Sequence, residues 1–280
     1  MREVNVKLVS DAVKDLSIST NCILGDEEVA YIKKMVNVEE SPTGKEILDM
    51  LLENARIARD EMIPICQDTG FTVIFLEVGQ EVHFTGGDIN EALADGVRRG
   101  YTDGFLRKSI LSDPIKRNNT GDNTPPVVHL TIVPGDKVKV TLAPKGGGSE
   151  NMSGVKMLKP SDGIEGVKNF VVERVDASGG NPCPPIVVGV GIGGTFEKCA
   201  YLAKKALLRP LGGRHPDPFY AEVEEELLRR VNATGIGPQG LGGRVTALDV
   251  HIETYPCHIA SLPCAVNLNC HASRHGQRVI

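Results

Sequence analysis

The sequence predicts a mixed α/β fold, because strand-like apolar runs alternate along the chain with segments of helical periodicity. The run FTVIFLEV at residues 71–78 is typical of a buried strand, and so is IVVGVG at residues 186–191. The composition fits a globular protein, with 41% apolar and 24% charged residues. We find no internal repeat and no low-complexity linker, so we expect one domain over residues 1–280.

Helix-starting and helix-ending residues define the elements of the first half. Ser41 and Pro42 form an N-cap and a first helical position, and Pro64 ends the amphipathic helix that follows. A second helix is expected over residues 89–98. The polar, turn-rich stretch of residues 106–126 is expected to be loop throughout.

The second half alternates in the same way. Strands at residues 127–133 and 137–143 flank the turn formers PGD, which predicts a β-hairpin. Helices are expected over residues 196–208 and 221–233, and the latter carries acidic residues early and arginines late, as the helix dipole favours. A strand over residues 245–253 then leads into a Cys- and His-rich segment.

Charge and cysteine usage narrow the class of function. The chain has 31 Lys and Arg against 36 Asp and Glu, no basic block and no Trp, which disfavours nucleic acid and anionic membranes as partners. No apolar segment is long enough to span a bilayer, and the charged start MREVNVKLVSDAVKDL does not resemble a signal peptide. Seven cysteines without a regular framework favour a reducing compartment, so we expect a cytoplasmic protein.

Two glycine-rich motifs invite a nucleotide-binding hypothesis. GVGIGG fits G-x-G-x-x-G through Gly189, Gly191 and Gly194, but the acidic residue required about 20 positions later is absent, since position 209 is Arg. Close packing of backbone is therefore the favoured reason for these glycines. KGGGSEN at residues 145–151 lacks the order of a phosphate loop, and either exposes N–H groups to a ligand or is a loose hairpin exit.

The seven cysteines divide by neighbourhood. Cys22 and Cys199 lie in apolar or helical context and are expected in the core. Cys66 and Cys183 lie in loops pinned by proline or glycine ahead of strands, which suits a fixed metal ligand. Three more thiols crowd the C-terminal segment: Cys257, Cys264 and Cys270.

The spacing of these thiols favours a cluster over zinc. No paired C-x-x-C spacing is present, as a structural zinc site would require. Widely separated single cysteines suit an iron–sulfur cluster assembled from distant loops, in which three thiolates would leave one iron open to a substrate. Spacing alone does not decide which three cysteines bind it.

Six motifs occur in a fixed order: CQDTG, KGGGSEN, NPCPP, GVGIGGT, GIGPQGLGG and AVNLNCHASRH. Together they resemble the α subunit of the two-subunit class I fumarate hydratases, which are oxygen-labile [4Fe-4S] hydro-lyases, and the α subunits of L(+)-tartrate dehydratase. The resemblance covers nearly the whole chain. It implies a single iron–sulfur hydro-lyase α-type domain.

The resemblance also implies a set of site residues. The cluster ligands would be Cys66, Cys183 and Cys270. The substrate contacts would be Gln67, Asp68, Arg107, Gly146 and Gly147. Asp68 and His258 would form the titratable pair that orients water or relays a proton, while Cys257 and Cys264 fall outside the pattern.

The reaction expected from this resemblance is the reversible hydration of fumarate to (S)-malate, with the open cluster iron acting as a Lewis acid. A separate β subunit, in an α2β2 assembly, would supply further carboxylate-binding groups and the proton-accepting residue. KGGGSEN, GIGGTFE and the absence of Trp favour fumarate as the small dicarboxylic acid substrate. The alternatives are dehydration of L(+)-tartrate to oxaloacetate and a non-catalytic iron–sulfur or thiol redox sensor.

Overall fold

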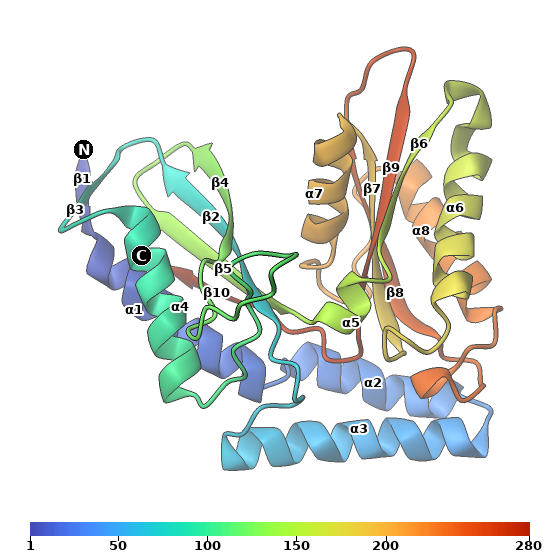
Figure 1. The fold of residues 1–280 in the computed structure, drawn as a ribbon. Helices are drawn as coiled ribbons and strands as arrows, with labels where there is room; N and C mark the ends of the chain where they lie inside the picture. Colours follow the sequence, from blue (N-terminus) through green and yellow to red (C-terminus); the bar gives the residue numbers. More distant parts are fainter. The chain divides into compact units, whose positions relative to one another are not determined.

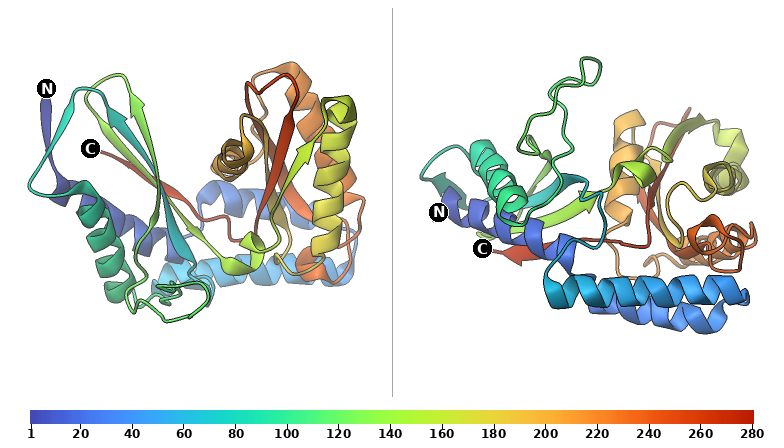
Figure 2. Two further views of the ribbon diagram at one scale, coloured as in Figure 1. Left: turned by 45° about the horizontal axis from the view of Figure 1, so that its top comes forward. Right: turned by 60° about the horizontal axis from the view of Figure 1, so that its bottom comes forward.

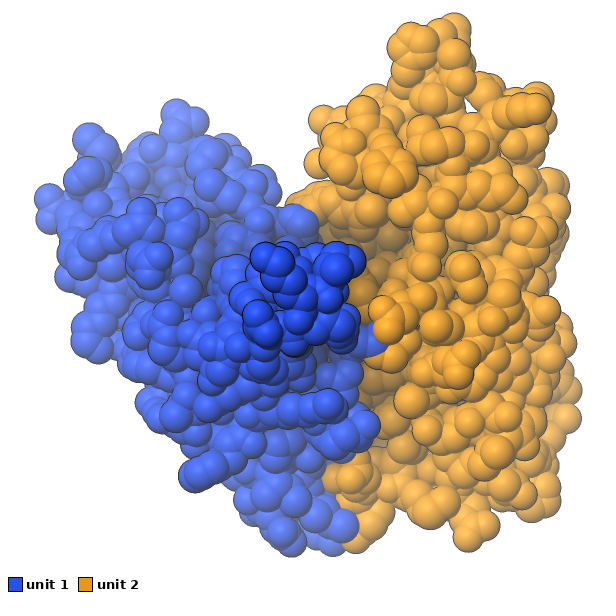
Figure 3. All heavy atoms as spheres, in the orientation of Figure 1, with its two compact units in different colours: residues 1–24, 55–147, 274–280 blue, residues 25–54, 148–273 orange.

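A computed structural model describes all 280 residues, Met1–Ile280 (Figure 1). The chain forms two compact units (Figure 3). Unit 1 comprises Met1–Leu24, Ala55–Gly147 and Arg274–Ile280, and unit 2 comprises Gly25–Asn54 and Gly148–Ser273. Both units are discontinuous in sequence, so no linker marks a boundary between them. The mixed α/β class is confirmed, while the single domain over residues 1–280 stays a prediction.

Unit 1 is built on a four-stranded sheet with the order β10-β5-β2-β4. Its elements are β1 (Arg2–Asn5), α1 (Val6–Cys22), β2 (Phe71–Gly79), β3 (Val82–Thr85), α4 (Ile89–Asp103), β4 (Val127–Val133), β5 (Val138–Lys145) and β10 (Gly276–Val279). Helices α1 and α4 cover one face of this sheet, and their apolar side chains form one core with those of β2 and β5 (Figure 2). The short strands β1 and β3 pair in parallel as a separate ribbon.

The predicted hairpin of residues 127–143 is wrong. Strands β4 and β5 do not pair with each other, because β2 lies between them, parallel to β4 and antiparallel to β5. The PGD turn instead wraps around the end of β2, where the N–H of Gly79 donates to the carbonyl of Lys137 at 2.8 Å. A Cβ at Gly79 would lie 2.4 Å from the carbonyl oxygen of Gly135, so glycine is required at this crossing.

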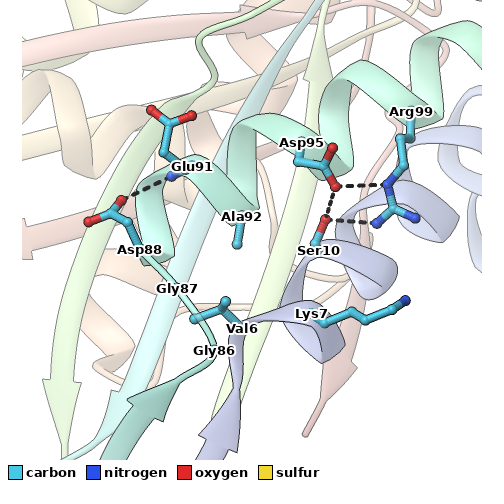
Figure 4. A pocket seen from close by; sticks show the side chains of 10 residues that line it. All are labelled: Val6, Lys7, Ser10, Gly86, Gly87, Asp88, Glu91, Ala92, Asp95 and Arg99. Carbon is cyan, nitrogen blue, oxygen red and sulfur yellow. Dashed lines mark hydrogen bonds and ion pairs between the residues drawn. The ribbon is translucent and has the colours of Figure 1, made fainter.

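Helices α1 and α4 approach closely enough that glycine is needed in their contact. A Cβ at Gly96 would lie 2.5 Å from the carbonyl oxygen of Ser10. A groove of about 500 Å³ opens near the N-terminal ends of the two helices (Figure 4). In it the Arg99 guanidinium donates to Asp95 at 2.9 Å and to the Ser10 hydroxyl at 2.7 Å, which ties the helices together.

Unit 2 is built on a second four-stranded sheet with the order β6-β9-β7-β8. Its strands are β6 (Gly154–Leu158), β7 (Ile186–Gly193), β8 (Ala247–Tyr255) and β9 (Leu262–Asn269). Its helices are α2 (Asp26–Val38), α6 (Gly163–Ser178), α7 (Phe196–Ala206) and α8 (Pro218–Asn232), with short turns η1 (Pro160–Asp162) and η2 (Pro238–Gly240). Helices α6 and α8 form the main core with one sheet face, and α7 covers the other (Figure 1).

Two elements cross the boundary between the units. Helix α3 (Pro42–Glu61) begins in unit 2 and ends in unit 1, and the single turn α5 (Gly147–Glu150) begins where unit 1 ends. As predicted, α3 starts at Pro42, and the Ser41 hydroxyl accepts from the N–H of Gly44 at 3.2 Å.

The glycines of GVGIGG serve close packing, as predicted. Helix α7 lies directly on β7, so a Cβ at Gly189 would meet the carbonyl oxygen of Ala203 at 2.0 Å. A Cβ at Gly191 would meet the carbonyl oxygen of Cys199 at the same distance. These glycines bring a helix onto a strand.

The remaining predicted elements differ mainly at their ends. The expected helices at residues 89–98, 196–208 and 221–233 correspond to α4, α7 and α8, and residues 106–126 contain no helix or strand of their own. Helices α1, α2 and α6 were not predicted. No helix has both the length and the apolar character needed to cross a membrane.

Candidate active site

Burial separates the cysteines into two sets. Cys22, Cys199 and Cys264 are buried, and desolvation raises the pKa of each thiol, that of Cys264 to about 12. Such thiols resist forming the thiolate that a metal requires. The other four are accessible: Cys66 and Cys270 are half-buried, and Cys183 and Cys257 are exposed. Three of these four are the predicted ligands, and Cys257 lies in the turn between β8 and β9. The accessibility of the predicted ligands and their places on loops fit an iron–sulfur cluster.

Cys66 lies in the CQDTG turn between α3 and β2, and Asp68 organises this turn. The N–H of Asp68 donates to the Cys66 Sγ at 3.4 Å. The Asp68 carboxylate accepts from the N–H of Gly70 at 2.9 Å and from the N–H of Gly147 at 2.8 Å. Asp68 therefore caps its own turn and also binds the KGGGSEN segment.

Two glycines allow these motifs to come together in unit 1. Gly70 has φ +67°, and a Cβ there would lie 2.4 Å from the main-chain carbonyl oxygen of Lys145. A Cβ at Gly146 would lie 3.3 Å from the Asp68 carboxylate. Unit 1 thus gathers Cys66 and Asp68 with Gly146 and Gly147.

Three buried side chains hold successive carbonyl groups of the same turn. The Arg274 guanidinium donates to the carbonyl of Asp68 at 3.1 Å. The Tyr101 hydroxyl donates to the carbonyls of Thr69 at 2.8 Å and Gly70 at 3.1 Å. The Asn123 side-chain amide donates to the carbonyl of Gly70 at 3.3 Å. Arg274 lies within the AVNLNCHASRH motif, but none of the three was predicted as a site residue.

The remaining predicted substrate contacts of unit 1 are on its surface. The side chain of Gln67 is exposed, and its Oε1 accepts from the Cys66 thiol at 3.1 Å. The carbonyl of Arg107 accepts from the Thr69 hydroxyl at 3.0 Å, which fixes this part of the loop beside the turn. The Arg107 guanidinium itself is exposed and makes no hydrogen bond or ion pair within the chain.

Unit 2 brings Cys183 and Cys270 to the same end of its sheet. Cys183 precedes β7 and Cys270 follows β9, and the paired residues Val187 and Asn269 join the two strands at this end. The N–H of His271 donates to the carbonyl of Cys183 at 3.3 Å. The two predicted ligands of unit 2 therefore lie on adjacent loops.

Gln239 supports the Cys183 loop from η2. Its side-chain amide donates to the carbonyl of Pro184 at 2.7 Å, and its main-chain N–H donates to the same oxygen at 2.8 Å. This contact connects the glycine-rich GIGPQGLGG motif to NPCPP. The role of Gln239 is not apparent from its spacing in the sequence.

His258 lies at the opposite end of the unit 2 sheet. It is in the turn between β8 and β9, whereas Cys183 and Cys270 flank the other ends of β7 and β9. At about 3.3 Å per residue, the paired part of β7 separates the two ends by roughly 20 Å. A pocket of about 570 Å³ adjoins His258 and is lined in part by Met157, Phe196 and Tyr255. Within unit 2, His258 is thus not grouped with the predicted cluster ligands.

Glu150 anchors the second half of KGGGSEN in unit 2. Its carboxylate accepts from the Lys204 ammonium at 2.6 Å and from the Asn267 amide at 2.9 Å. Asn267 belongs to β9, which leads directly to Cys270. The motif is therefore attached to the strand that carries a predicted ligand.

The three predicted ligands are divided between the units, with Cys66 in unit 1 and Cys183 and Cys270 in unit 2. No three His, Cys, Asp or Glu side chains are grouped so that they could hold a metal ion. The chain passes between the units within KGGGSEN, at Gly147–Gly148, and within NCHASRH, at Ser273–Arg274. Two of the six motifs thus contain a crossing point of the chain.

Comparison with known proteins shows the family. The family model described as fumarate hydratase (Fumerase) matches residues 10–279. A Methanocaldococcus jannaschii protein provisionally named as an L(+)-tartrate dehydratase subunit alpha is 42% identical over 271 residues, which are 95% of this chain and 95% of that protein. The L(+)-tartrate dehydratase subunit alpha of Escherichia coli strain K12 is 34% identical over 278 residues, 98% of this chain and 91% of that protein.

The fold and the motifs define an α/β chain with accessible loop thiols, and its relatives place it in a class of hydro-lyases. The chain belongs to the fumarate hydratase family.

Proposed function

We propose that this chain is the α subunit of a [4Fe-4S] hydro-lyase that reversibly hydrates fumarate to (S)-malate. The observation that carries the proposal is the division of the cysteines, in which the three family-matched thiols are accessible on loops and three of the other four are buried, the exception being the exposed Cys257. The family match over residues 10–279 supports the reaction class. The proposed ligands are Cys66, Cys183 and Cys270.

When bound, the cluster would supply a Lewis-acidic iron for the substrate hydroxyl and one carboxylate. Arg107 would bind the other carboxylate through its planar guanidinium, which has no partner within the chain and is free to form a bidentate contact. Gln67 would orient the substrate beside the turn. The exposed position of Arg107 means that its role would be in binding rather than in folding.

Asp68 would orient water or relay a proton, because its half-buried carboxylate is fixed on both oxygens by main-chain N–H groups. The N–H of Gly147 already donates to this carboxylate, so Gly147 would act by holding Asp68 in place, while Gly146 would contact the substrate. His258 is retained as a catalytic candidate from the family motif. Its position at the far end of the unit 2 sheet gives that assignment no geometric support.

A separate β subunit, in an α2β2 assembly, and a cytoplasmic location complete the proposal. The relatives from Methanocaldococcus jannaschii and Escherichia coli both carry the name subunit alpha, which supports a second chain. The same names favour L(+)-tartrate as a second candidate substrate. Assay of the chain with its partner against fumarate and tartrate under anaerobic conditions separates the two reactions. Malate formation that requires both chains would dismiss the redox-sensor alternative.

The proposal is tested by replacing cysteines from each set. Anaerobically reconstituted protein should hold about four iron and four sulfide with visible absorbance, and Cys66→Ser, Cys183→Ser and Cys270→Ser should each lose most of both. The matched control is Cys199→Ala, which removes a buried thiol and should keep the full cluster. Colourless wild-type protein with stoichiometric zinc, or full iron content in all three Ser variants, would contradict the proposal.

A further inference from the structure

Arg274 is a buried cation behind the Cys66–Asp68 turn, and its contacts reach two separate parts of unit 1. The side chain is 3% exposed. One terminal nitrogen donates to the Asn21 side-chain oxygen at 3.0 Å and the other to the carbonyl of Asp68 at 3.1 Å. Asn21 is itself fixed, since its amide donates to the carbonyl of Ser17 at 2.9 Å.

The Arg274 guanidinium makes no ion pair within the chain, and the Asp68 carboxylate in the same region accepts from main-chain N–H groups instead. Neither acceptor of Arg274 is charged, and its buried Nε has no hydrogen-bond partner. A buried charge without a partner is costly, so a purely structural link between α1 and the turn would be better made by a neutral side chain. The cation therefore points to negative charge that arrives from outside the chain.

The surroundings of Arg274 indicate where that negative charge would arrive. A Cβ at Gly146 would lie 3.8 Å from the Arg274 guanidinium and 3.3 Å from the Asp68 carboxylate, so the three groups share one small region. Cys66 is two residues from Asp68, and its sulfur accepts the Asp68 N–H. The same region thus carries a thiol, a carboxylate and a cation that makes no ion pair.

We propose that Arg274 is a positioning residue of the hydro-lyase site, which holds the Asp68 peptide group and balances the negative charge of the bound dicarboxylate. This inference rests on the proposed function. Arg274 does not contact the substrate itself. It acts by fixing the orientation of the Asp68 carboxylate and the Cys66 sulfur.

Tyr101 provides a matched control, because it holds the next two carbonyls of the same turn without bringing a charge. In the complete enzyme, Arg274→Met should lower kcat about a hundredfold, the effect of a small misplacement of reacting groups. Arg274→Lys should recover at least about tenfold of that loss, since it keeps the charge but not the fork of donors. Tyr101→Phe should keep kcat within about threefold of wild type, since it leaves the charge in place.

A second readout is independent of turnover. In the cluster-free full-length chain, Arg274→Met should increase the iodoacetamide alkylation rate of Cys66 about tenfold, measured by peptide mass mapping, because its turn loses a charge-assisted hydrogen bond. Cys183 and Cys270, in unit 2, should react as in wild type. If Arg274→Met proves too unstable, the same selective change, smaller in size, is expected in Arg274→Lys.

Three results would overturn the inference: wild-type alkylation of Cys66 in Arg274→Met, an equal increase at all three thiols, or an Arg274→Lys enzyme no better than Arg274→Met. Failure of the proposed function looks different. A wild-type enzyme inactive on fumarate and tartrate would refute that function, while selective alkylation of Cys66 would still support the positioning role.

Discussion

The thiol-bearing loops of the two units are fastened by different means. In unit 1, the Cys66 turn depends on buried side chains, since Arg274, Tyr101 and Asn123 each hold one or two of its carbonyls. In unit 2, the loops of Cys183 and Cys270 depend on the register of β7 with β9 and the N–H of His271, with one side chain, that of Gln239, added at Pro184. The first arrangement is sensitive to the loss of the Arg274 guanidinium or the Asn123 amide, and the second to a shift of the sheet.

The largest loss of stability is expected where unit 2 has no room for a side chain. In Gly191→Ala the new Cβ would lie 2.0 Å from the carbonyl oxygen of Cys199, so α7 must move away from β7. We expect a loss of about 3 kcal/mol or more in the free energy of unfolding, measured by denaturant titration. The control Gly148→Ala, whose Cβ would be 3.6 Å from its nearest neighbour, should stay within about 1 kcal/mol of wild type. Equal stability of the two variants would show that close packing of α7 on β7 does not stabilise the sheet of unit 2.

The next effect is expected at Glu39, which ties the α2–α3 connection to the segment entering β8. Its carboxylate accepts N–H groups of Glu40, Ser41, Arg244 and Val245 at 2.8–3.0 Å. Glu39→Gln should cost about 2–3 kcal/mol, because one oxygen becomes a donor that faces other donors. The control Glu40→Gln, which removes only an exposed ion pair with Arg244, should cost at most about 1 kcal/mol.

The effect of Glu39 should depend on pH. Burial works to raise the pKa of Glu39, but the main-chain N–H groups lower it by more, so the pKa lies below its ordinary value of 4.5. The carboxylate therefore stabilises the fold above pH 4.5, and this contribution is lost as the pH falls through the folded-state pKa. The stability difference between wild type and Glu39→Gln should be largest near neutral pH and shrink in acid. If the stability difference between wild type and Glu39→Gln instead grows in acid, the ionised Glu39 carboxylate does not stabilise this connection.

Unit 1 should respond to the loss of one buried amide. Asn123 is fully buried, accepts from the N–H of Ser109 at 2.7 Å, and has φ +63°. Glycine tolerates that φ, but Asn123→Gly removes the side-chain contacts with the N–H of Ser109 and the carbonyl of Gly70. We therefore expect a loss of about 1–2 kcal/mol in the free energy of unfolding. Asn123→Ala should lose more, because alanine also strains the backbone there. A stable Asn123→Gly would mean that the turn does not rely on this side chain.

The smallest effect on stability is expected at Arg107, whose main chain supports the turn while its side chain is exposed. Arg107→Ala should change the free energy of unfolding by no more than about 0.5 kcal/mol. It should raise KM for the dicarboxylate about tenfold, as the loss of a charged contact with the substrate implies. Lys116→Ala, an exposed cation on the same loop, should leave KM unchanged. Equal KM values in the two variants would show that the Arg107 side chain does not bind the substrate.

Local chemistry in the sequence was sufficient for several features. The cap at Ser41 and Pro42, the packing role of the β7 glycines, and the burial of Cys22 and Cys199 all follow from immediate neighbours. Such features depend on helical period, backbone freedom and the polarity of nearby residues. Each of these is readable within a short window of the chain.

Strand order and the convergence of distant residues were decided only by the tertiary structure. Sequence adjacency predicted that β4 pairs with β5, but β2, which is more buried than β4, lies between them and Gly79 admits the crossing turn. Arg274, Tyr101 and Asn123 meet at one turn although long stretches of chain separate them. Pairing and burial compare segments far apart in the chain, and the free energy of such contacts has no local signature in the amino-acid order.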